Sequence, residues 1–493
     1  MGTAPQTVQQ PLVLSRAHIF GDDLAPPRQI YVTYIPVVLA LAGVLGWLMS
    51  DESGMVLACV VATAVALYTL WGWLFLRAPT RFSTLLAMSL LLGYGGGALN
   101  TWITLPRGGL SLAEVMGLSE GVLSRGMAAV LFSSAALYFL GELFEKPIFG
   151  ASFHFQITRK TRSLIYVGTL AILAGYLTHS LDVGGTVSSQ GHISIPGLFL
   201  IWLYYPLTAI SAAAFLTSER RSDRLLTGLS TLILLLMLTV LGRRATIYTS
   251  TEILFLLPLA GYRWRGRLIR NMLLIAGLTA FVVVCALTTM LLRISGESMR
   301  RSQKPVTVVR RFQAAGKLVK KGGAVTIASN ATQQNFQSRT FVLAFLANIL
   351  DASSRITPAL GQDAVSLMAT AVPTALYPDK DRFFSEEGLV DRQFNFSYLD
   401  EANSVLTAGA TDFGLLGMIL YPLLLVAIAR FVYDFVGRWL TATPLMIVTL
   451  SLIFMFLQTE SILTAYFVHF RDTLLFSALI VLFMSFPRFR LRA

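Results

Sequence analysis

The residues in this chain whose types and spacing best suit chemistry are arginines that interrupt apolar sequence. Arg243 and Arg244 stand in a tight turn between two apolar runs, and Arg339 and Arg355 each border another apolar stretch. A guanidinium held at a membrane boundary costs about 3 kcal/mol, so an anionic partner is expected. Arginine offers planar, bidentate donors to phosphate. The pattern therefore predicts a bound diphosphate, with lipid phosphates or, for Arg339 and Arg355, a solvated surface as the alternative.

Candidate proton acceptors form a second set, because glycosyl or phosphoryl transfer must take a proton from the attacking hydroxyl. Glu401 precedes one late apolar run, and Glu460 follows another, where partial desolvation is expected. His469, Arg471 and Asp472 are expected just before the last run, with Asp472 pairing with Arg471 or capping its helix. Glu401, Glu460 and His469 are thus the candidate bases, and Arg471 is a fifth candidate for the diphosphate.

Other polar clusters favour plainer roles. The basic run that includes Lys320 and Lys321 is typical of a segment lying on anionic headgroups. The sequence contains no P-loop, Rossmann, nucleophile-elbow or zinc motif, and Asp379-Lys-Asp381 is a poor match to a metal-binding Asp-x-Asp. We therefore expect neither a metal nor a cofactor. A soluble nucleotide-sugar transferase is disfavoured.

Composition indicates the elements that must position these residues. Of the 493 residues, 55% are hydrophobic and 13% are charged, against roughly 25% charged in soluble domains. This balance predicts an all-α polytopic membrane protein. The net charge of +13 is spread over loops between apolar runs, so nucleic acid is not an expected partner. Cys59 and Cys285 both lie within apolar runs and are expected to serve packing.

Twelve apolar segments are long enough to suggest about 12 transmembrane helices. Their approximate bounds are 30–49, 55–76, 83–105, 121–144, 163–178, 195–216, 225–241, 247–262, 271–292, 405–429, 441–457 and 473–486. The chain is thus divided into a tail (1–29), helices 1–9 (30–292), a large polar region (293–404), helices 10–12 (405–487) and a second tail (488–493).

Basic residues set the expected orientation. With the amino terminus inside, the inner segments carry twenty Lys or Arg and the short outer loops four. Cytoplasmic loops collect positive charge, so both termini are predicted inside and region 293–404 outside. That region is too long for an idle loop. Its apolar stretches predict helices on the outer face, chiefly around Phe341 to Leu350 and Gln362 to Ala371.

The pattern of spans and one large outer region resembles bacterial oligosaccharide repeat-unit polymerases of the Wzy type, which are related to O-antigen ligases. Short phrases carry the resemblance: Gly242-Arg-Arg, Ser338-Arg339, the run 371–378 and Thr407-Ala-Gly-Ala-Thr-Asp-Phe-Gly-Leu-Leu-Gly417. The resemblance implies a GT-C-like fold in the bacterial inner membrane. It also implies metal-independent polymerisation of undecaprenyl-diphosphate-linked oligosaccharides into exopolysaccharide or O-antigen, with Arg243 or Arg244 and Arg339 or Arg355 on the diphosphate. Membrane lipid, a chain-length regulator and a flippase are the implied partners.

Other functions stay open at this point. An O-antigen ligase would carry a His and an Asn at the start of a helix, and His469 lacks that context. A lipid-linked-sugar flippase or transporter would show internal repeats and binding residues near the midplane. The charges within spans, Arg125, Glu142, Glu252 and Asp412, are instead expected toward span ends. A structural export subunit is the third alternative.

Overall fold

The structure is a computed structural model of the whole chain. It describes residues 30–76, 78, 80–104, 109–149, 153–178, 195–241, 243–262, 264, 268–301, 313–317, 320, 341–373, 376–377, 379–383, 385–396 and 403–485. Within these ranges every regular element is a helix. The apolar composition thus resolves into helices, which satisfy their own backbone polar groups.

Seven helices are long and apolar enough to cross a membrane among the described residues. They are Glu52–Leu76, Phe82–Thr104, Glu120–Phe144, Pro196–Thr217, Ile269–Thr289, Val405–Gly437 and Leu463–Leu482. Four shorter apolar helices accompany them, at Ile35–Met49, Ala245–Leu259, Val342–Ser353 and Ala442–Phe456. The protein is therefore a multi-pass, all-helical membrane protein.

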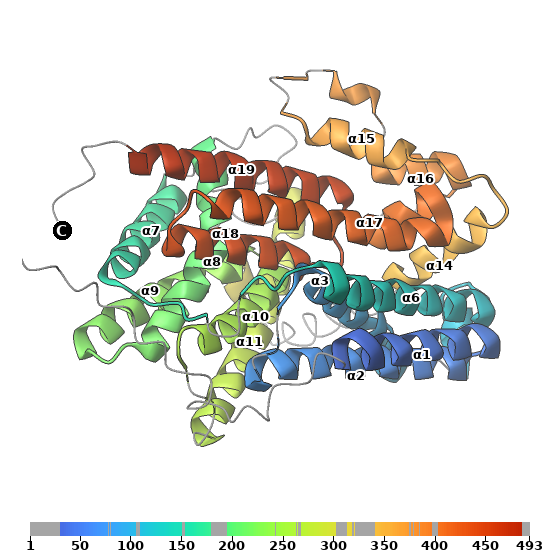
Figure 1. Ribbon diagram of the computed structural model, residues 1–493, viewed down its shortest axis with the longest axis horizontal. Helices are drawn as coiled ribbons and strands as arrows, with labels where there is room; N and C mark the ends of the chain where they lie inside the picture. Colours follow the sequence, from blue (N-terminus) through green and yellow to red (C-terminus); the bar gives the residue numbers. More distant parts are fainter. Residues whose placement is uncertain are drawn as a thin grey trace, which may run out of the picture.

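The amino-terminal helices form one side of the bundle (Figure 1). They are η3 (Ile30–Tyr34), α1 (Ile35–Met49), α2 (Glu52–Leu76), α3 (Phe82–Leu90), η4 (Leu91–Gly96), α4 (Gly97–Thr104), α5 (Leu112–Val115) and α6 (Glu120–Phe144). Gly95 in η4 packs closely against α2, since a Cβ on it would meet the Ala62 Cβ at 2.5 Å. Small residues let neighbouring helices approach in this way.

The middle of the chain adds α7 (Arg159–Leu177), α8 (Ile195–Thr217), α9 (Arg221–Leu241), α10 (Arg243–Leu259) and α11 (Leu268–Arg301). The carboxyl-terminal part contains α14 (Phe341–Ser353), α15 (Gln362–Ala371), η5 (Lys380–Arg382), α16 (Glu386–Phe394), α17 (Val405–Gly437), α18 (Ala442–Phe456) and α19 (Leu463–Ser485). Figure 1 shows α14, α15 and α16 together at one end of the bundle, over α17 and beside α6. We call this the α15 end.

Each of the twelve expected segments contains a helix, and α14 and α15 confirm the two helices expected in the polar region. Three boundaries were wrong by eight or more residues. Helix α11 continues to Arg301 rather than ending at 292, and α17 continues to Gly437 rather than ending at 429. The last helix was expected to begin at residue 473, but α19 begins at Leu463. His469, Arg471 and Asp472 therefore lie inside a helix rather than before it. The helix tolerates them because each is satisfied: His469 Nε2 lies 3.0 Å from the Ser451 carbonyl, and Arg471 pairs with Asp472 at 2.7 Å.

Candidate functional site

The site starts from a break in α17. Phe413 (φ −141°, ψ 19°) and Gly414 (φ 58°, ψ −140°) are non-helical inside this helix. The Gly414 conformation is closed to residues with a Cβ, so glycine is required at this point. Beyond the break the chain turns so sharply that Gly409 and Gly417 meet, and a Cβ on either would overlap the backbone of the other. The phrase from Thr407 to Gly417 therefore encodes a bent helix.

Backbone groups freed by the break find new partners. The Ala359 N–H donates to the Thr411 carbonyl (2.9 Å), and the Leu360 N–H donates to the Asp412 carbonyl (3.0 Å). Farther along α17, Pro422 lacks the N–H that would serve Met418, and the Ser133 hydroxyl of α6 donates to that carbonyl instead (2.6 Å). Buried irregular backbone is tolerated in a membrane only when it is satisfied like this.

The segment that pairs with the break is itself strained. Leu360 has a φ of 53° and is 67% exposed, and Gly361 follows with a φ of 90°. A left-handed conformation in a non-glycine residue is uncommon, and such strain gathers at functional sites. These two residues immediately precede α15, so the break and the start of α15 form one unit.

Asp412 joins that unit together. Its carboxylate accepts the backbone N–H groups of Asp363 and Ala364, each at 3.0 Å, and the Tyr421 hydroxyl. These two N–H groups belong to the first turn of α15, where backbone donors lack helical partners and the helix dipole favours a negative charge. Asp412 therefore caps α15 from the turn of α17.

Asp363 lies beside this carboxylate but lacks comparable hydrogen bonds. The residue is fully buried, and neither carboxyl oxygen has a hydrogen-bond partner among the described residues. Burial, together with the neighbouring Asp412 carboxylate, raises the pKa of Asp363. Two acids thus share the start of α15, and the available donors all serve one of them. This arrangement favours a proton on the other.

Basic groups hold the opposite end of α15. Arg471 Nη1 donates to the Ala371 carbonyl (2.6 Å), and Lys380 Nζ donates to the Thr370 carbonyl (2.9 Å). Cations at a helix carboxyl terminus complement its dipole. Helix α15 is thus fixed by an acid at its start and by two bases at its end. Arg471 ties it to α19.

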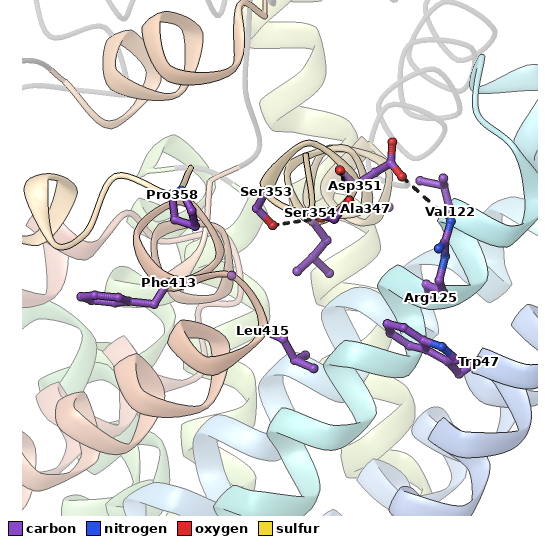
Figure 2. A pocket seen from close by; sticks show the side chains of 12 residues that line it. Trp47, Val122, Arg125, Ala347, Asp351, Ser353, Ser354, Pro358, Phe413 and Leu415 are labelled. Atoms are coloured by element: carbon purple, nitrogen blue, oxygen red, sulfur yellow. Dashed lines mark hydrogen bonds and ion pairs between the residues drawn. The ribbon is translucent and has the colours of Figure 1, made fainter. Parts of the chain in front are cut away.

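A cavity of about 350 Å³ opens on the other side of the break. Its lining comes from α1, α6, α14, the following loop and α17: Trp47, Val122, Arg125, Ala347, Leu350, Asp351, Ser353, Ser354, Pro358, Phe413, Gly414 and Leu415. Figure 2 shows Asp351 directed toward Arg125, from which it is 3.9 Å away. Arg355 donates to the same Asp351 at 2.5 Å. Arg125 and Asp351 therefore line a space with serine hydroxyls, and Arg355 contacts the same acid from outside the lining.

Apolar side chains face outward around this polar unit. Val365 and Met368, three residues apart on α15, are exposed, as are Leu360 and Leu376 beside it and Leu416 on α17. Side chains spaced by three residues share one helix face. An amphipathic helix of this kind lies well at a membrane interface, with its apolar face in lipid.

The predicted anion-binding arginines are only partly described. Arg339 lies outside the described residues, as do the side chains of Arg243 and Arg244, whose backbone begins α10. The Arg355 side chain is 71% exposed and pairs with Asp351. The Arg471 side chain is 33% exposed and donates to the last residue of α15. The contacts of these last two are with different groups. Convergence of the arginines on one site stays a prediction.

The predicted bases fare differently from one another. Glu401 lies outside the described residues. Glu460 is half-buried in the turn between α18 and α19, whose Thr459 hydroxyl donates to the Ser89 carbonyl (2.7 Å). His469 is on α19, bonded through Nε2 to Ser451 of α18. A histidine in that setting links two helices and does not line the cavity at the break.

Sequence reasoning missed three residues that the structure brings forward. Asp412 and Arg125 were expected only as charges toward span ends, and Asp363, within the expected helix at 362–371, was given no role. The available signal was the Gly409, Asp412 and Gly414 spacing inside an apolar run, together with Gly361 and Asp363 at a helix start. An acid in an apolar helix next to glycines indicates a break that exposes backbone donors.

Among the described residues, no group of three or more His, Cys, Asp or Glu side chains is placed to hold a metal ion. Comparison of the chain with protein-family models, with curated proteins and with solved structures gave no match. Function must therefore be argued from this site.

Proposed function

We propose that the protein is a membrane glycosyltransferase that polymerises undecaprenyl-diphosphate-linked oligosaccharide repeat units at the outer face of the bacterial inner membrane. The product would be an exopolysaccharide or an O-antigen. The α15 end would face outward, and both termini would lie in the cytoplasm. Twelve membrane crossings and a GT-C-like architecture belong to the same proposal.

One observation carries this proposal: the broken helix α17 combines a polar cavity and a buried acid pair beneath an apolar interfacial surface. A polyprenyl-linked sugar has matching parts, because its lipid tail needs apolar surface while its diphosphate and glycan need polar groups. Val365 and Met368 supply the first, and Arg125 and the cavity hydroxyls supply the second. The outward orientation is supported by the charge asymmetry of the short loops.

The proposed reaction is an inverting or retaining displacement at an anomeric carbon. A hydroxyl of one repeat unit forms a new C–O bond to that carbon, the C–O bond to the diphosphate breaks, and the hydroxyl loses its proton. Undecaprenyl diphosphate leaves with the bonding electron pair. Arginines placed before the reaction stabilise the charge that develops on the leaving group. Arg125 at the cavity joins Arg243, Arg244, Arg339, Arg355 and Arg471 as candidates for this role.

Proton transfer has new candidates in this arrangement. Asp412 immediately precedes the cavity residues Phe413 and Gly414, and Asp363 lies behind it. We propose that the pair positions the break and buffers the proton released by the acceptor, with Glu401 and Glu460 retained as alternative bases. His469 is the weakest of the earlier candidates because its bonds tie α18 to α19.

Deletion of the gene tests the function directly. Mass spectrometry of lipid-linked glycans should show single repeat units on undecaprenyl diphosphate, accessible from the outer leaflet. Accumulation of units confined to the inner leaflet would identify a flippase. Normal polymer left on its lipid carrier would identify a ligase. Unchanged lipid-linked glycans would reject the polymerase function and would favour a structural export subunit.

A further inference from the structure

Glu252 is a second buried acid, far from the α15 end in sequence and in setting. It lies nine residues after the start of α10 and seven before its end (Arg243–Leu259), so it is central and not terminal as expected. The side chain is fully buried, and neither carboxyl oxygen has a hydrogen-bond partner among the described residues. An ionisable group at the middle of an apolar helix is a functional candidate by default.

Among the described helices that surround Glu252, none carries a basic residue near its middle. Helix α10 packs against α2, α8, α9, α11 and α18. The basic residues of these helices lie toward helix ends in the sequence, and they are Arg221 and Arg224 in α9, Arg270, Arg293, Arg300 and Arg301 in α11, and Arg243 and Arg244 in α10 itself. An unpaired carboxylate in such surroundings is strongly disfavoured.

The other titratable side chains on the helices around Glu252 are mainly phenols and thiols. Tyr205 of α8 lies near Glu252, and its ring stacks on Phe454 at 4.0 Å. Tyr248 of α10, one turn before Glu252, meets the same Phe454 edge-on at 5.7 Å. The other titratable groups on the packed helices are Tyr68 and Cys59 of α2, Tyr204 of α8 and Cys285 of α11. Helix α18 contributes none, and the acids Asp223 of α9, Glu297 of α11 and Glu52 of α2 lie near helix ends.

Hydroxyl oxygens complete the environment. Thr249, three residues before Glu252 on the same helix face, is fully buried and its hydroxyl has no partner among the described residues. The Thr249 hydroxyl can accept from a carboxylic acid or donate to a carboxylate, so it suits either form of Glu252. Burial among described helices that carry no basic residue near the middle is what favours the protonated form.

We propose that Glu252 is a proton-binding site in the middle of the membrane bundle, occupied at neutral pH and independent of the glycan site at the α15 end. Binding or release of this proton switches a charge between α8 and α10. It gives the bundle a response to proton activity that the outer-face chemistry does not require.

A hydrophobic carbodiimide tests the proposal on the full-length wild-type protein in detergent micelles. Such reagents add to a protonated, apolar carboxylic acid, whose proton moves to the reagent nitrogen as the carboxyl oxygen bonds to its carbon. Peptide mapping by mass spectrometry should find N,N′-dicyclohexylcarbodiimide on Glu252 at pH 7, with labelling falling at least tenfold at a sufficiently alkaline pH. Glu142, which is equally buried but paired with Arg81, is the internal control and should stay unlabelled.

Three results would count against the proposal, two from labelling and one from a variant. One is the absence of label on Glu252 at every pH while the protein remains folded. The other is labelling that sodium chloride suppresses and choline chloride does not, because that pattern indicates a sodium site. A Glu252→Gln variant, which mimics the protonated acid, should melt within a few degrees of wild type at pH 7 and should resist alkaline pH better. An alkaline profile identical to that of wild type would also count against the site.

Discussion

Two carboxylates in this protein cap helices in the same way, at opposite ends of α6, and their surroundings differ. Glu145 follows the last residue of α6 and accepts the N–H groups of Phe82 (2.7 Å) and Ser83 (3.0 Å) at the start of α3. Asp412 lies near the first turns of α6, across the cavity that Arg125 lines, and accepts two N–H groups at the start of α15. Both use the positive end of a helix dipole.

The two caps differ in the charged side chains beside them. Near Glu145, Arg81 forms an ion pair with Glu142 and donates to the Glu145 carbonyl (2.8 Å), so a base accompanies the two acids. Near Asp412 the neighbouring charge is another acid, Asp363, without a partner among the described residues. A buried cluster that contains an ion pair is typical of a structural role, whereas like charges that perturb one another are typical of functional sites. The comparison therefore locates the candidate site at the α15 end.

Removing the Asp412 carboxylate should have the largest effect. Asp412→Ala leaves two backbone N–H groups and the Tyr421 hydroxyl without their acceptor. Each buried group left unsatisfied costs about 1–3 kcal/mol, so a total of about 3 kcal/mol or more is expected. Thermal unfolding in detergent and polymer yield should both fall. Asp412→Asn, which keeps the size and one acceptor oxygen, should fold better yet still lose polymer yield.

The matched control is Glu145→Gln, at the carboxyl-terminal end of α6. It should lower stability while leaving polymer yield per folded molecule near that of wild type. Equal losses of yield per folded molecule in Asp412→Asn and Glu145→Gln would break the comparison, because both caps would then be merely structural.

Cations at the α15 end should matter next. If Arg125 holds the leaving diphosphate, Arg125→Ala should remove about 2–4 kcal/mol of transition-state stabilisation, or roughly a hundredfold or more in rate. Lysine should rescue poorly because it lacks the bidentate fork.

The same size of loss is expected for the central arginine among Arg243, Arg244 and Arg339. Arg355→Ala should lose less rate, because the Arg355 side chain is 71% exposed where it pairs with the same Asp351. Polymerisation rates in reconstituted vesicles measure this, and wild-type rates in all variants would reject the mechanism.

The acid pair predicts a pH effect whose sign can be worked out. Burial and Asp412 raise the pKa of Asp363, so the folded protein keeps this proton when the unfolded chain has released it. Stability is then fully present below about pH 4, where an ordinary aspartate titrates, and is lost as pH rises through the raised pKa. Asp363→Asn should remove that loss and be more stable than wild type at alkaline pH. Melting temperatures across pH provide the measurement, and parallel curves for the two proteins would contradict it.

Much of the fold could be predicted from apolar periodicity alone, since α14 and α15 appear where Phe341 to Leu350 and Gln362 to Ala371 were expected. The start of α19 could not, because hydropathy counts His469, Arg471 and Asp472 as solvent-exposed groups. Only tertiary partners such as the Ser451 and Ala371 carbonyls reveal that they are satisfied. The acid pair was missed for the same reason: Asp363 and Asp412 are 49 residues apart and meet only because α17 breaks.

The smallest expected effects come from two lysines, one that is hydrogen-bonded to the end of α15 and one that is not. Lys380 Nζ donates to the Thr370 carbonyl at the end of α15, whereas Lys320 is exposed in a basic run that suits lipid headgroups. Lys380→Ala should cost about 1 kcal/mol, the usual net contribution of one hydrogen bond, and should speed amide exchange in the last turn of α15. Lys320→Ala removes the same charge and should change neither quantity measurably. Exchange followed by mass spectrometry compares the two variants. Equal exchange in both would mean that Lys380 does not stabilise the last turn of α15, which Arg471 then holds without it.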